Sequence, residues 1–217
     1  MHSRALTTYY ARRAAEYETI YQIPERQGDL RQLESLAPEP FHGLDVLEIA
    51  CGTGYWTQFI ARSARRILAV DYSPEVLEIA QKKAYGNCDV SFRESDAYAL
   101  SNVDGEYPAG FCGFWWSHVP KENRIDFLNI FHSKLRHNAV VLLIENMYVK
   151  GSSTPISRTD DNGNTYQQRK LTDGSTHEVL KNFTTENELK EIFADRATTI
   201  QYKSLKHYWL LKYRVCK

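Results

Sequence analysis

A short apolar run that ends in an acid and enters a glycine turn constrains this chain most. Residues 46–54 read Val-Leu-Glu-Ile-Ala-Cys-Gly-Thr-Gly, and a second apolar run ends at Asp71, 71 − 48 = 23 residues after Glu48. Two parallel strands that present their carboxyl ends to one nucleotide-like ligand have this order, with the second acid placed to bind both ribose hydroxyls. Gly52 and Gly54 allow a tight turn and a close approach of the backbone to the ligand. The pattern predicts an α/β fold with a nucleotide site at its strand ends.

The helix after this turn distinguishes two kinds of ligand. A dinucleotide fingerprint needs a third glycine, which lets the helix pack closely on the strand. Here the bulky residues Tyr55 and Trp56 open the helix instead. The segment resembles motif I of the class I S-adenosylmethionine-dependent methyltransferases, whose glycine turn holds the amino acid end of the cofactor. Ala50 replaces the first glycine of that motif, which suggests a slightly less cramped first turn.

Four later segments resemble further motifs of the same family, in the same order and at plausible spacing: 70–74, 90–97, 111–120 and 138–147. The resemblance implies that Asp71 and its neighbour Tyr72 contact the ribose end of the cofactor. It also implies that Asp96 binds the adenine amino group and that the backbone of Ala97 meets the adenine ring. Asp71 and Asp96 are also reasonable as plain helix caps, but five coincidences in the correct order are much harder to explain.

Periodicity along the rest of the chain agrees with this fold class. Predicted strands near 44–50, 66–71, 89–94, 109–116 and 139–147 alternate with helices near 55–64, 74–84 and 120–136. A helix near 185–194 then precedes two adjacent strands, 197–205 and 207–216. We therefore expect a doubly wound, mostly parallel seven-stranded sheet with an antiparallel C-terminal edge, the Rossmann-like fold of the methyltransferases.

The chain is long enough for one α/β domain, which we expect to span residues 1–217. Its predicted parts are an N-terminal helical lid over 1–40, a cofactor-binding core over 41–147, a substrate cap over 148–184 and a C-terminal helix and strand pair over 185–217.

Aromatic residues are dense near the predicted site. A sulfonium cation is favoured near ring faces, so we expect aromatic rings to wall the cofactor: Tyr10, Tyr55, Trp56, Trp115 and Trp116. Core packing explains each of these rings equally well. The stretch 9–17 also resembles the tyrosine-rich lid helix of many small-molecule methyltransferases, which implies that Tyr10 and, as a second candidate, Arg13 contact the cofactor; Tyr9 is expected to contact the substrate. A surface helix with solvated arginines is the alternative.

His118 is the predicted general base. It follows the fourth strand at the carboxyl edge, where the methyl acceptor should lie. An ordinary histidine pKa near 6.5 suits proton removal from a hydroxyl or ammonium group at neutral pH. A structural histidine that bonds a backbone carbonyl remains an equal alternative.

Specificity is expected in the stretch 148–184, which is long for a plain connection. Residues 165–171 and 176–183 are predicted to pair as a hairpin about Asp173-Gly174. Tyr166, Arg169 and His177 would then contact the substrate, and Arg158 or Arg169 could clamp an acidic or carbonyl-rich group. A solvated surface hairpin is the competing interpretation.

Bulk properties narrow the possible partners. Lys plus Arg and Asp plus Glu are each 27, and this balance argues against a strong nucleic acid binder. No apolar run approaches the roughly 18 residues of a membrane helix, and the four cysteines have the spacing of reduced thiols rather than of a disulfide or metal site. We expect a cytoplasmic protein without nucleic acid, membrane or metal partners; the oligomeric state is left open.

Together these features predict S-adenosylmethionine-dependent methyl transfer to an oxygen or nitrogen atom of a small molecule. A nicotinamide-dependent oxidoreductase shares the glycine turn and the ribose acid, but the missing glycine counts against it. A non-catalytic subunit that keeps the fold is expected to lose the cofactor acids, yet Glu48, Asp71 and Asp96 are all present.

Overall fold

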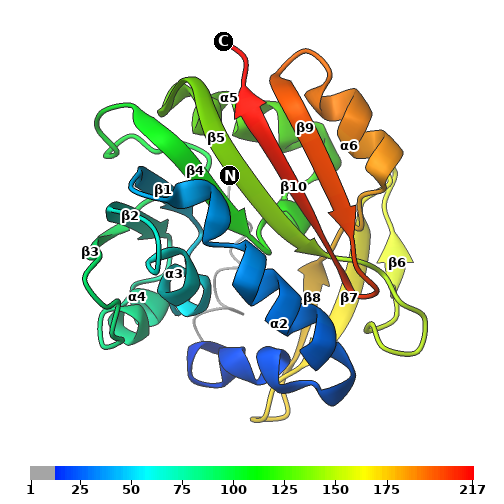
Figure 1. Cartoon of the computed structure of the whole chain (residues 1–217). Helices are drawn as coiled ribbons and strands as arrows, with labels where there is room; N and C mark the ends of the chain where they lie inside the picture. The colour runs from blue at the N-terminus through cyan, green and yellow to red at the C-terminus, as the bar shows by residue number, and fades with distance from the viewer. Residues whose placement is uncertain (1–12) are drawn as a thin grey trace.

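The computed structural model describes residues 13–217, which form a seven-stranded sheet in the order β3-β2-β1-β4-β5-β10-β9 (Figure 1). Strands β1 to β5 are parallel, whereas β10 is antiparallel to both of its neighbours. The strands are β1 (Asp45–Ile49), β2 (Arg66–Asp71), β3 (Asp89–Glu94), β4 (Tyr107–Gly113), β5 (Leu135–Asn146), β9 (Ala197–Ser204) and β10 (Tyr208–Val215). The mostly parallel sheet with an antiparallel C-terminal edge is therefore confirmed.

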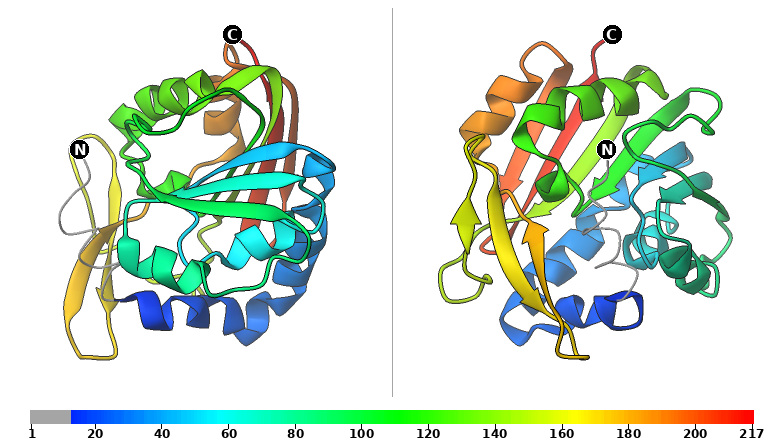
Figure 2. Two further views of the ribbon diagram at one scale, coloured as in Figure 1. Left: turned by 90° about the vertical axis from the view of Figure 1, so that its left-hand side faces the viewer. Right: turned by 180° about the vertical axis from the view of Figure 1, so that it is seen from behind.

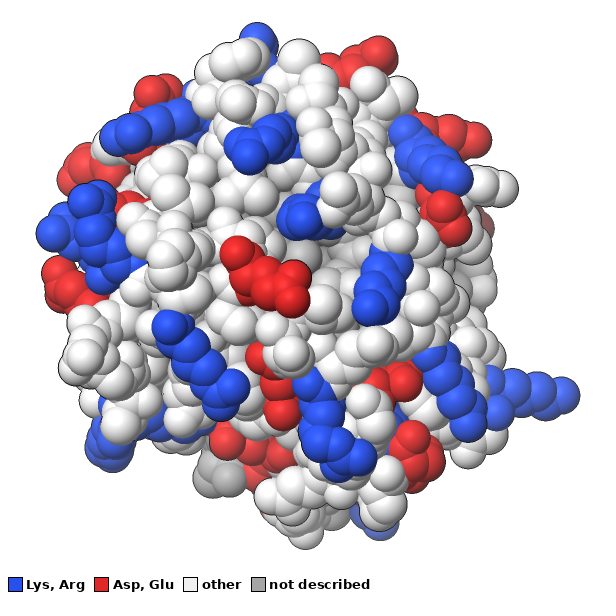
Figure 3. All heavy atoms as spheres, in the orientation of Figure 1, with Lys and Arg blue, Asp and Glu red and all other residues white. Residues whose placement is uncertain are grey.

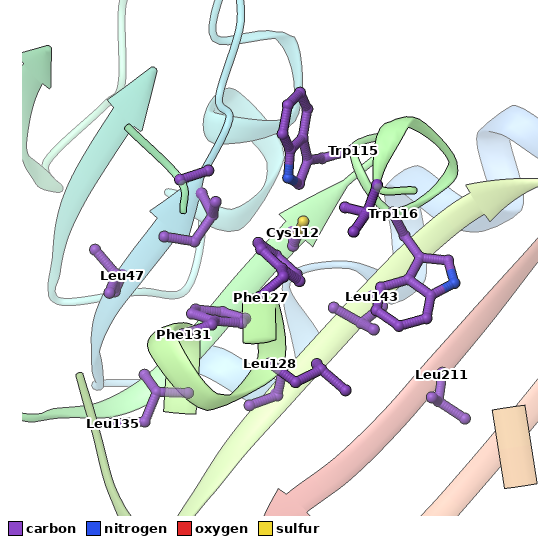
Figure 4. Packing of buried hydrophobic residues seen from close by; sticks show 14 of the residues in the cluster. Leu47, Cys112, Trp115, Trp116, Phe127, Leu128, Phe131, Leu135, Leu143 and Leu211 are labelled. Atoms are coloured by element: carbon purple, nitrogen blue, oxygen red, sulfur yellow. The ribbon is translucent and has the colours of Figure 1, made fainter. Parts of the chain in front are cut away.

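Helices lie on both faces of this sheet (Figure 2). One face carries a core in which α5 (Arg124–Ser133) and α6 (Glu186–Phe193) pack on the sheet; the other carries α2 (Gln27–Leu36), α3 (Tyr55–Ile60) and α4 (Pro74–Ala80). The alternation of side chains along a strand produces the two layers, since Leu47 contributes to one core and Val46 to the other. Figure 4 shows the α5 side of this packing around Phe127 and Phe131.

The fourth strand ends earlier than its apolar run predicts. Residues 109–116 were expected to be extended, but β4 stops at Gly113 and Phe114 adopts φ 61°. This left-handed residue turns the chain into the short 3₁₀ helix η4 (Trp116–His118). Trp115 and Trp116 are therefore presented from a turn and not from opposite faces of a strand. Helices α3 and α4 are also shorter than the predicted 55–64 and 74–84.

A second, antiparallel sheet is built by the stretch after β5. It consists of β6 (Arg158–Thr159), β7 (Thr165–Lys170) and β8 (Thr176–Leu180), and Arg169 pairs with His177. The predicted hairpin is thus confirmed. The described N-terminal part forms the 3₁₀ helices η1 (Ala14–Gln22), η2 (Pro24–Arg26) and, after α2, η3 (Glu39–Phe41). The hairpin and η1 lie at the end of the main sheet toward which β4 and β5 point (Figure 1).

Other sequence-based expectations concern the surface and the thiols. Within the described residues 13–217, no helix has the length and apolar character needed to cross a bilayer. Acidic and basic side chains are interspersed on the face drawn in Figure 3, as the equal counts of the two charges predict. The four cysteines are free, with Cys51 and Cys112 buried.

Candidate functional site

The glycine turn after β1 uses left-handed backbone at three positions. Ala50, Gly52 and Gly54 have φ values of 54°, 56° and 75°. A Cβ on Gly54 would lie 2.5 Å from the Tyr85 hydroxyl and 3.1 Å from Ala80 Cβ, so no larger residue fits there. Ala50 adopts the conformation that favours glycine, at a cost of about 1–2 kcal/mol for a residue with a Cβ. The expectation of a less cramped first turn is therefore wrong.

Asp71 fastens this turn to the end of β2. Its Oδ2 accepts a hydrogen bond from the Gly52 amide at 2.8 Å, and its Oδ1 accepts one from the Ser73 amide at 3.0 Å. Burial raises the pKa of the Asp71 carboxyl, while these backbone N–H donors act against the rise. Each carboxylate oxygen has a second lone pair, which can accept a hydrogen bond from a ligand hydroxyl.

An open cavity of about 720 Å³ lies over this turn and the carboxyl ends of four neighbouring strands. Many of the residues predicted for the cofactor line it: Ala50, Gly52, Asp71, Tyr72, Ala97 and Trp115. The catalytic candidate His118 lines it as well, so the structure brings these predicted residues together.

Three of the predicted aromatic residues lie outside that lining. Tyr55 stacks on Tyr21 with ring centroids 3.7 Å apart, and the Trp56 indole N–H donates to the Tyr21 hydroxyl at 3.1 Å. Trp116 is buried against Phe127 and Phe193 and donates to Thr184 Oγ1 at 3.0 Å. Figure 4 shows Trp115 and Trp116 pointing in different directions. For these three residues, the packing alternative describes their positions better than the cofactor wall.

Three further predicted residues support the cavity without lining it. Glu48 is buried below the turn, where burial raises the pKa of its carboxyl to about 8. Asp96 caps the next turn, because its Oδ1 accepts from the Tyr98 amide at 2.8 Å, while its neighbours Ser95 and Ala97 line the cavity. Gly54 lies behind, at the start of α3. A direct contact of Asp96 with adenine stays a prediction.

A second cavity, of about 780 Å³, adjoins the first through Tyr17, Phe114 and His118, which line both. Its walls come from distant parts of the chain: η1, η2, the end of β5, the stretch 152–154, the hairpin β7–β8 and the start of β10. Tyr17, Phe114 and His118 therefore form the boundary between the first cavity, over the glycine turn, and the second cavity, which could hold another molecule.

His118 stands at this boundary and is only 6% exposed. Its Nδ1 lies 2.7 Å from the Leu180 carbonyl oxygen, which fixes Nδ1 as the protonated nitrogen of the neutral ring. Burial lowers the pKa of His118 well below 6.5, and the positive charges of Lys181, Arg169 and Arg13 lower it further. The expected ordinary pKa is therefore wrong, and the imidazole is neutral at pH 7.

Lys181, which lines the second cavity, belongs to a buried ion pair. The Lys181 ammonium lies 3.0 Å from Glu145 Oε1 and donates to Ser117 Oγ at 2.6 Å. Burial opposes the charge on Glu145, yet Lys181 and the amides of Asn146 and Ser117 hold the pKa of this carboxyl below its usual range. The pair joins β5 to the hairpin and to η4 at one point.

The predicted substrate residues separate along the hairpin. Arg169 and Gln167 line the second cavity, whereas Tyr166, which precedes Gln167 in the same strand, turns to the other face. There its hydroxyl donates to Asp160 at 2.9 Å and Arg158 lies 3.6 Å above its ring. His177 lies outside the lining and its Nε2 is 2.9 Å from Ser175 Oγ. Tyr9 and Tyr10 fall outside the described residues.

Sequence reasoning missed several lining residues. Tyr17, Ser95 and Phe114 lie within segments that resemble family motifs, but the sequence did not single them out, and Phe114 reaches the site through a left-handed turn that the apolar run concealed. Arg26 and Lys181 are single basic residues in otherwise polar stretches. Nothing in their local sequence distinguishes them from solvated residues. Within residues 13–217, no cluster of three or more His, Cys, Asp or Glu side chains could hold a metal ion.

Comparison with known proteins gives one family match. A family model described as a methyltransferase domain matches residues 46–138, which include the glycine turn, Asp71 and Asp96. The ubiquinone biosynthesis O-methyltransferase of Methylocella silvestris is 31% identical over 74 residues, which is 34% of this chain and 29% of that protein. The matched segment spans about a third of the length of such curated relatives.

Solved structures resemble the chain over almost its whole length. A DhpI-SAH complex is 27% identical, with a TM-score of 0.77 over 99% of this chain and 98% of that one. A DhpI-SAM-HEP complex is 25% identical, with a TM-score of 0.78 over 99% of this chain and 100% of that one. The likeness therefore includes the N-terminal helices and the hairpin, which lie outside the matched domain.

Proposed function

The chain belongs to the class I S-adenosylmethionine-dependent methyltransferases, and we propose that it transfers a methyl group from S-adenosylmethionine to an oxygen or nitrogen atom of a small molecule. The family confirms the cofactor predicted from the sequence. The residues of the first cavity fit such a cofactor, because the glycine turn brings bare backbone to the cavity and Asp71 supplies a carboxylate for ribose hydroxyls.

One observation carries the proposal: the two cavities meet at Tyr17, Phe114 and His118. The cofactor supplies the activated methyl group, and the protein must align an acceptor with it and exclude water. A shared boundary with Phe114 and the buried Trp115 nearby suits this task. The walls contributed by η1 and the hairpin narrow the second cavity, which favours a small acceptor over a polymer.

His118 is the proposed general base. With Nδ1 directed at the Leu180 carbonyl, the basic lone pair of the neutral ring is on Nε2. In the proposed step the acceptor oxygen or nitrogen forms a bond to the methyl carbon as the sulfur–carbon bond breaks. Nε2 takes the proton that a hydroxyl or ammonium acceptor releases, and the sulfur keeps the electron pair.

Calorimetry with S-adenosylmethionine and S-adenosylhomocysteine tests the first part of the proposal. We expect both to bind the purified chain, and NAD, as the control, not to bind. A screen of small hydroxyl and amine acceptors with methyl-labelled cofactor then tests the transfer. A folded sample that binds neither sulfur compound would contradict the proposed function.

A further inference from the structure

The second cavity has a one-sided distribution of charge. Arg13, Arg26, Arg169 and Lys181 line it, and its described lining contains no aspartate or glutamate. The outer face in Figure 3 is different, because acidic and basic side chains alternate there. Glu145, behind the lining, compensates Lys181, and the three arginines remain as an excess of positive charge. Such a cavity attracts anions, since the low-dielectric surroundings screen the charges less than water does.

Two of these cations form no ion pair with a carboxylate of the described residues. Arg169 donates to Gln167 Oε1 at 3.2 Å from Nε and at 2.6 Å from a terminal nitrogen, and no carboxylate of residues 13–217 forms an ion pair with it. Arg26 donates to the Ser152 carbonyl at 2.9 Å and to its hydroxyl at 3.3 Å, and its buried Nε has no hydrogen-bond partner in the same range. The printed hydrogen bonds of both guanidinium groups thus go to neutral oxygens, although the neighbouring carboxylate of Glu25 attracts Arg26 electrostatically.

Lys181 is in a different state, because Glu145 compensates its charge inside the wall. Arg26 and Arg169 line the cavity from two separate elements, η2 and β7. The hydroxyl residues Ser153 and Thr154 and the amide of Asn146 line the space between these elements. Two cationic forks with neutral donors beside them match the planar or tetrahedral oxygens of an oxyanion.

We propose that the second cavity binds an acceptor through an oxyanionic group, a carboxylate or a phosphate-type group, and that Arg26 and Arg169 select for it. This inference rests on the proposed function, because it assigns the second cavity to the acceptor. A neutral acceptor would leave both arginines without a counter-charge, whereas an anion gives each a charge-assisted hydrogen bond.

The boundary residue His118 reports on this binding. Arg169, Lys181 and Arg13 depress its pKa, so a bound anion beside them offsets part of their effect and raises that pKa. The anionic acceptor therefore strengthens the base that the proposed reaction uses. A neutral molecule in the same space has no such effect.

Binding of small probes to the chain loaded with S-adenosylhomocysteine tests the inference. Loading is checked by calorimetry first, so failure of the cofactor to bind is recorded separately as failure of the proposed function. Inorganic phosphate and acetate are then titrated, with trimethyl phosphate and acetamide as their neutral counterparts, while the ring resonances of His118 are followed by NMR. We expect one of the anions to bind, its affinity to fall with added salt, and the pKa of His118 to rise when it is bound. Whether phosphate or acetate binds more tightly distinguishes a site for a tetrahedral group from a site for a carboxylate.

Variants assign the effect to the two arginines. Arg169→Gln and Arg26→Gln are each expected to weaken anion binding by about 10-fold or more, because each removes a hydrogen bond between charged groups. Arg169→Lys keeps the charge and is expected to weaken binding less. The matched controls remove exposed basic residues: Lys170→Gln in the same strand as Arg169, and Arg31→Gln in α2, which follows the η2 segment of Arg26. Both should bind as the parent does. Three results would overturn the inference. The loaded protein binds no anion, it binds the neutral probes as tightly as the anions, or the control variants lose as much anion affinity as the arginine variants.

Discussion

The two cavities that meet at His118 are built in different ways. The first cavity, which we assign to the cofactor, is lined mainly between residues 50 and 118 by the turns that follow the parallel strands β1 to β4, together with Tyr17 of η1, so the course of the backbone sets much of its shape. The second cavity, which we assign to the acceptor, is lined by side chains from segments spread between Arg13 and Tyr208. A backbone site tolerates little variation in conformation, whereas a side-chain site can change its specificity without a change of fold.

The matched family domain agrees with this difference. It covers residues 46–138, the part that contributes the glycine turn and Asp71, and it ends before the hairpin begins. Substitutions on the two sides should therefore have separable effects. Cofactor-side changes should alter cofactor affinity, and acceptor-side changes should alter stability, turnover or acceptor choice.

The largest expected effect on stability is on the acceptor side. Lys181→Met leaves Glu145 buried without its partner, which should lower the free energy of unfolding by about 3–5 kcal/mol. Lys190→Met, which removes an exposed pair with Glu186, is the control and should cost less than about 1 kcal/mol. Urea unfolding measures both. If Lys181→Met combined with Glu145→Gln recovers none of the loss, the charge on Glu145 is not its cause.

The next largest effect is a loss of turnover on substitution of His118, at the boundary of the two cavities. His118→Gln should lower kcat by about 10²- to 10⁴-fold while S-adenosylhomocysteine affinity stays the same, because only the proton acceptor is lost. His132→Gln removes another buried histidine, bonded to Tyr213 at 2.8 Å, and should lower stability without this loss of turnover. Labelled methyl transfer to an acceptor from the screen measures kcat.

The same assay has an expected pH profile. Because the pKa of His118 is lowered in the folded chain, the base stays neutral as pH falls through 6.5. The value of kcat/KM, which reports on the free enzyme, should stay level there and decline only at lower pH. A decline centred at pH 6.5 would show that His118 is either not desolvated or not the base.

On the cofactor side, Asp71→Asn should weaken S-adenosylhomocysteine binding by about 10- to 100-fold, the range for a lost hydrogen bond to a charged group. The substitution also places the NH2 group of asparagine opposite one of the backbone N–H groups of Gly52 and Ser73, so two donors face each other and the turn is disturbed. Asp89→Asn, at the exposed start of β3, is the control. Equal affinities for the two variants by calorimetry would remove Asp71 from the site.

The smallest effect tests the turn itself. Ala50→Gly should raise the free energy of unfolding by less than about 1 kcal/mol. The substitution relieves the left-handed strain of the folded chain, but glycine also adds conformational entropy to the unfolded chain, which cancels most of the gain. Ala50→Val should instead destabilise the chain. Urea unfolding compares the two, and a valine variant as stable as the parent would contradict the left-handed conformation of Ala50.

The sequence was sufficient for the sheet and for part of the cofactor cavity. The strand boundaries 66–71 and 89–94 agree with β2 and β3 because apolar runs and their acids are local signals. It was insufficient for the aromatic residues, since Tyr55, Trp56 and Trp116 have the composition of a cofactor wall but pack with Tyr21, Phe127 and Phe193. Ring character alone does not say which side of a helix or turn faces a cavity.

The sequence by itself therefore determined the family, the order of the strands along the chain and the turn at Gly52 and Asp71. These depend on backbone conformation and on residues close together in sequence. Only the tertiary structure decided that Arg26 and Arg169 face one cavity, that Tyr166 turns away from it and that Lys181 is buried against Glu145. The physical reason is that burial and electrostatic partnership depend on which segments of the chain meet in space, and no local pattern records which of them meet.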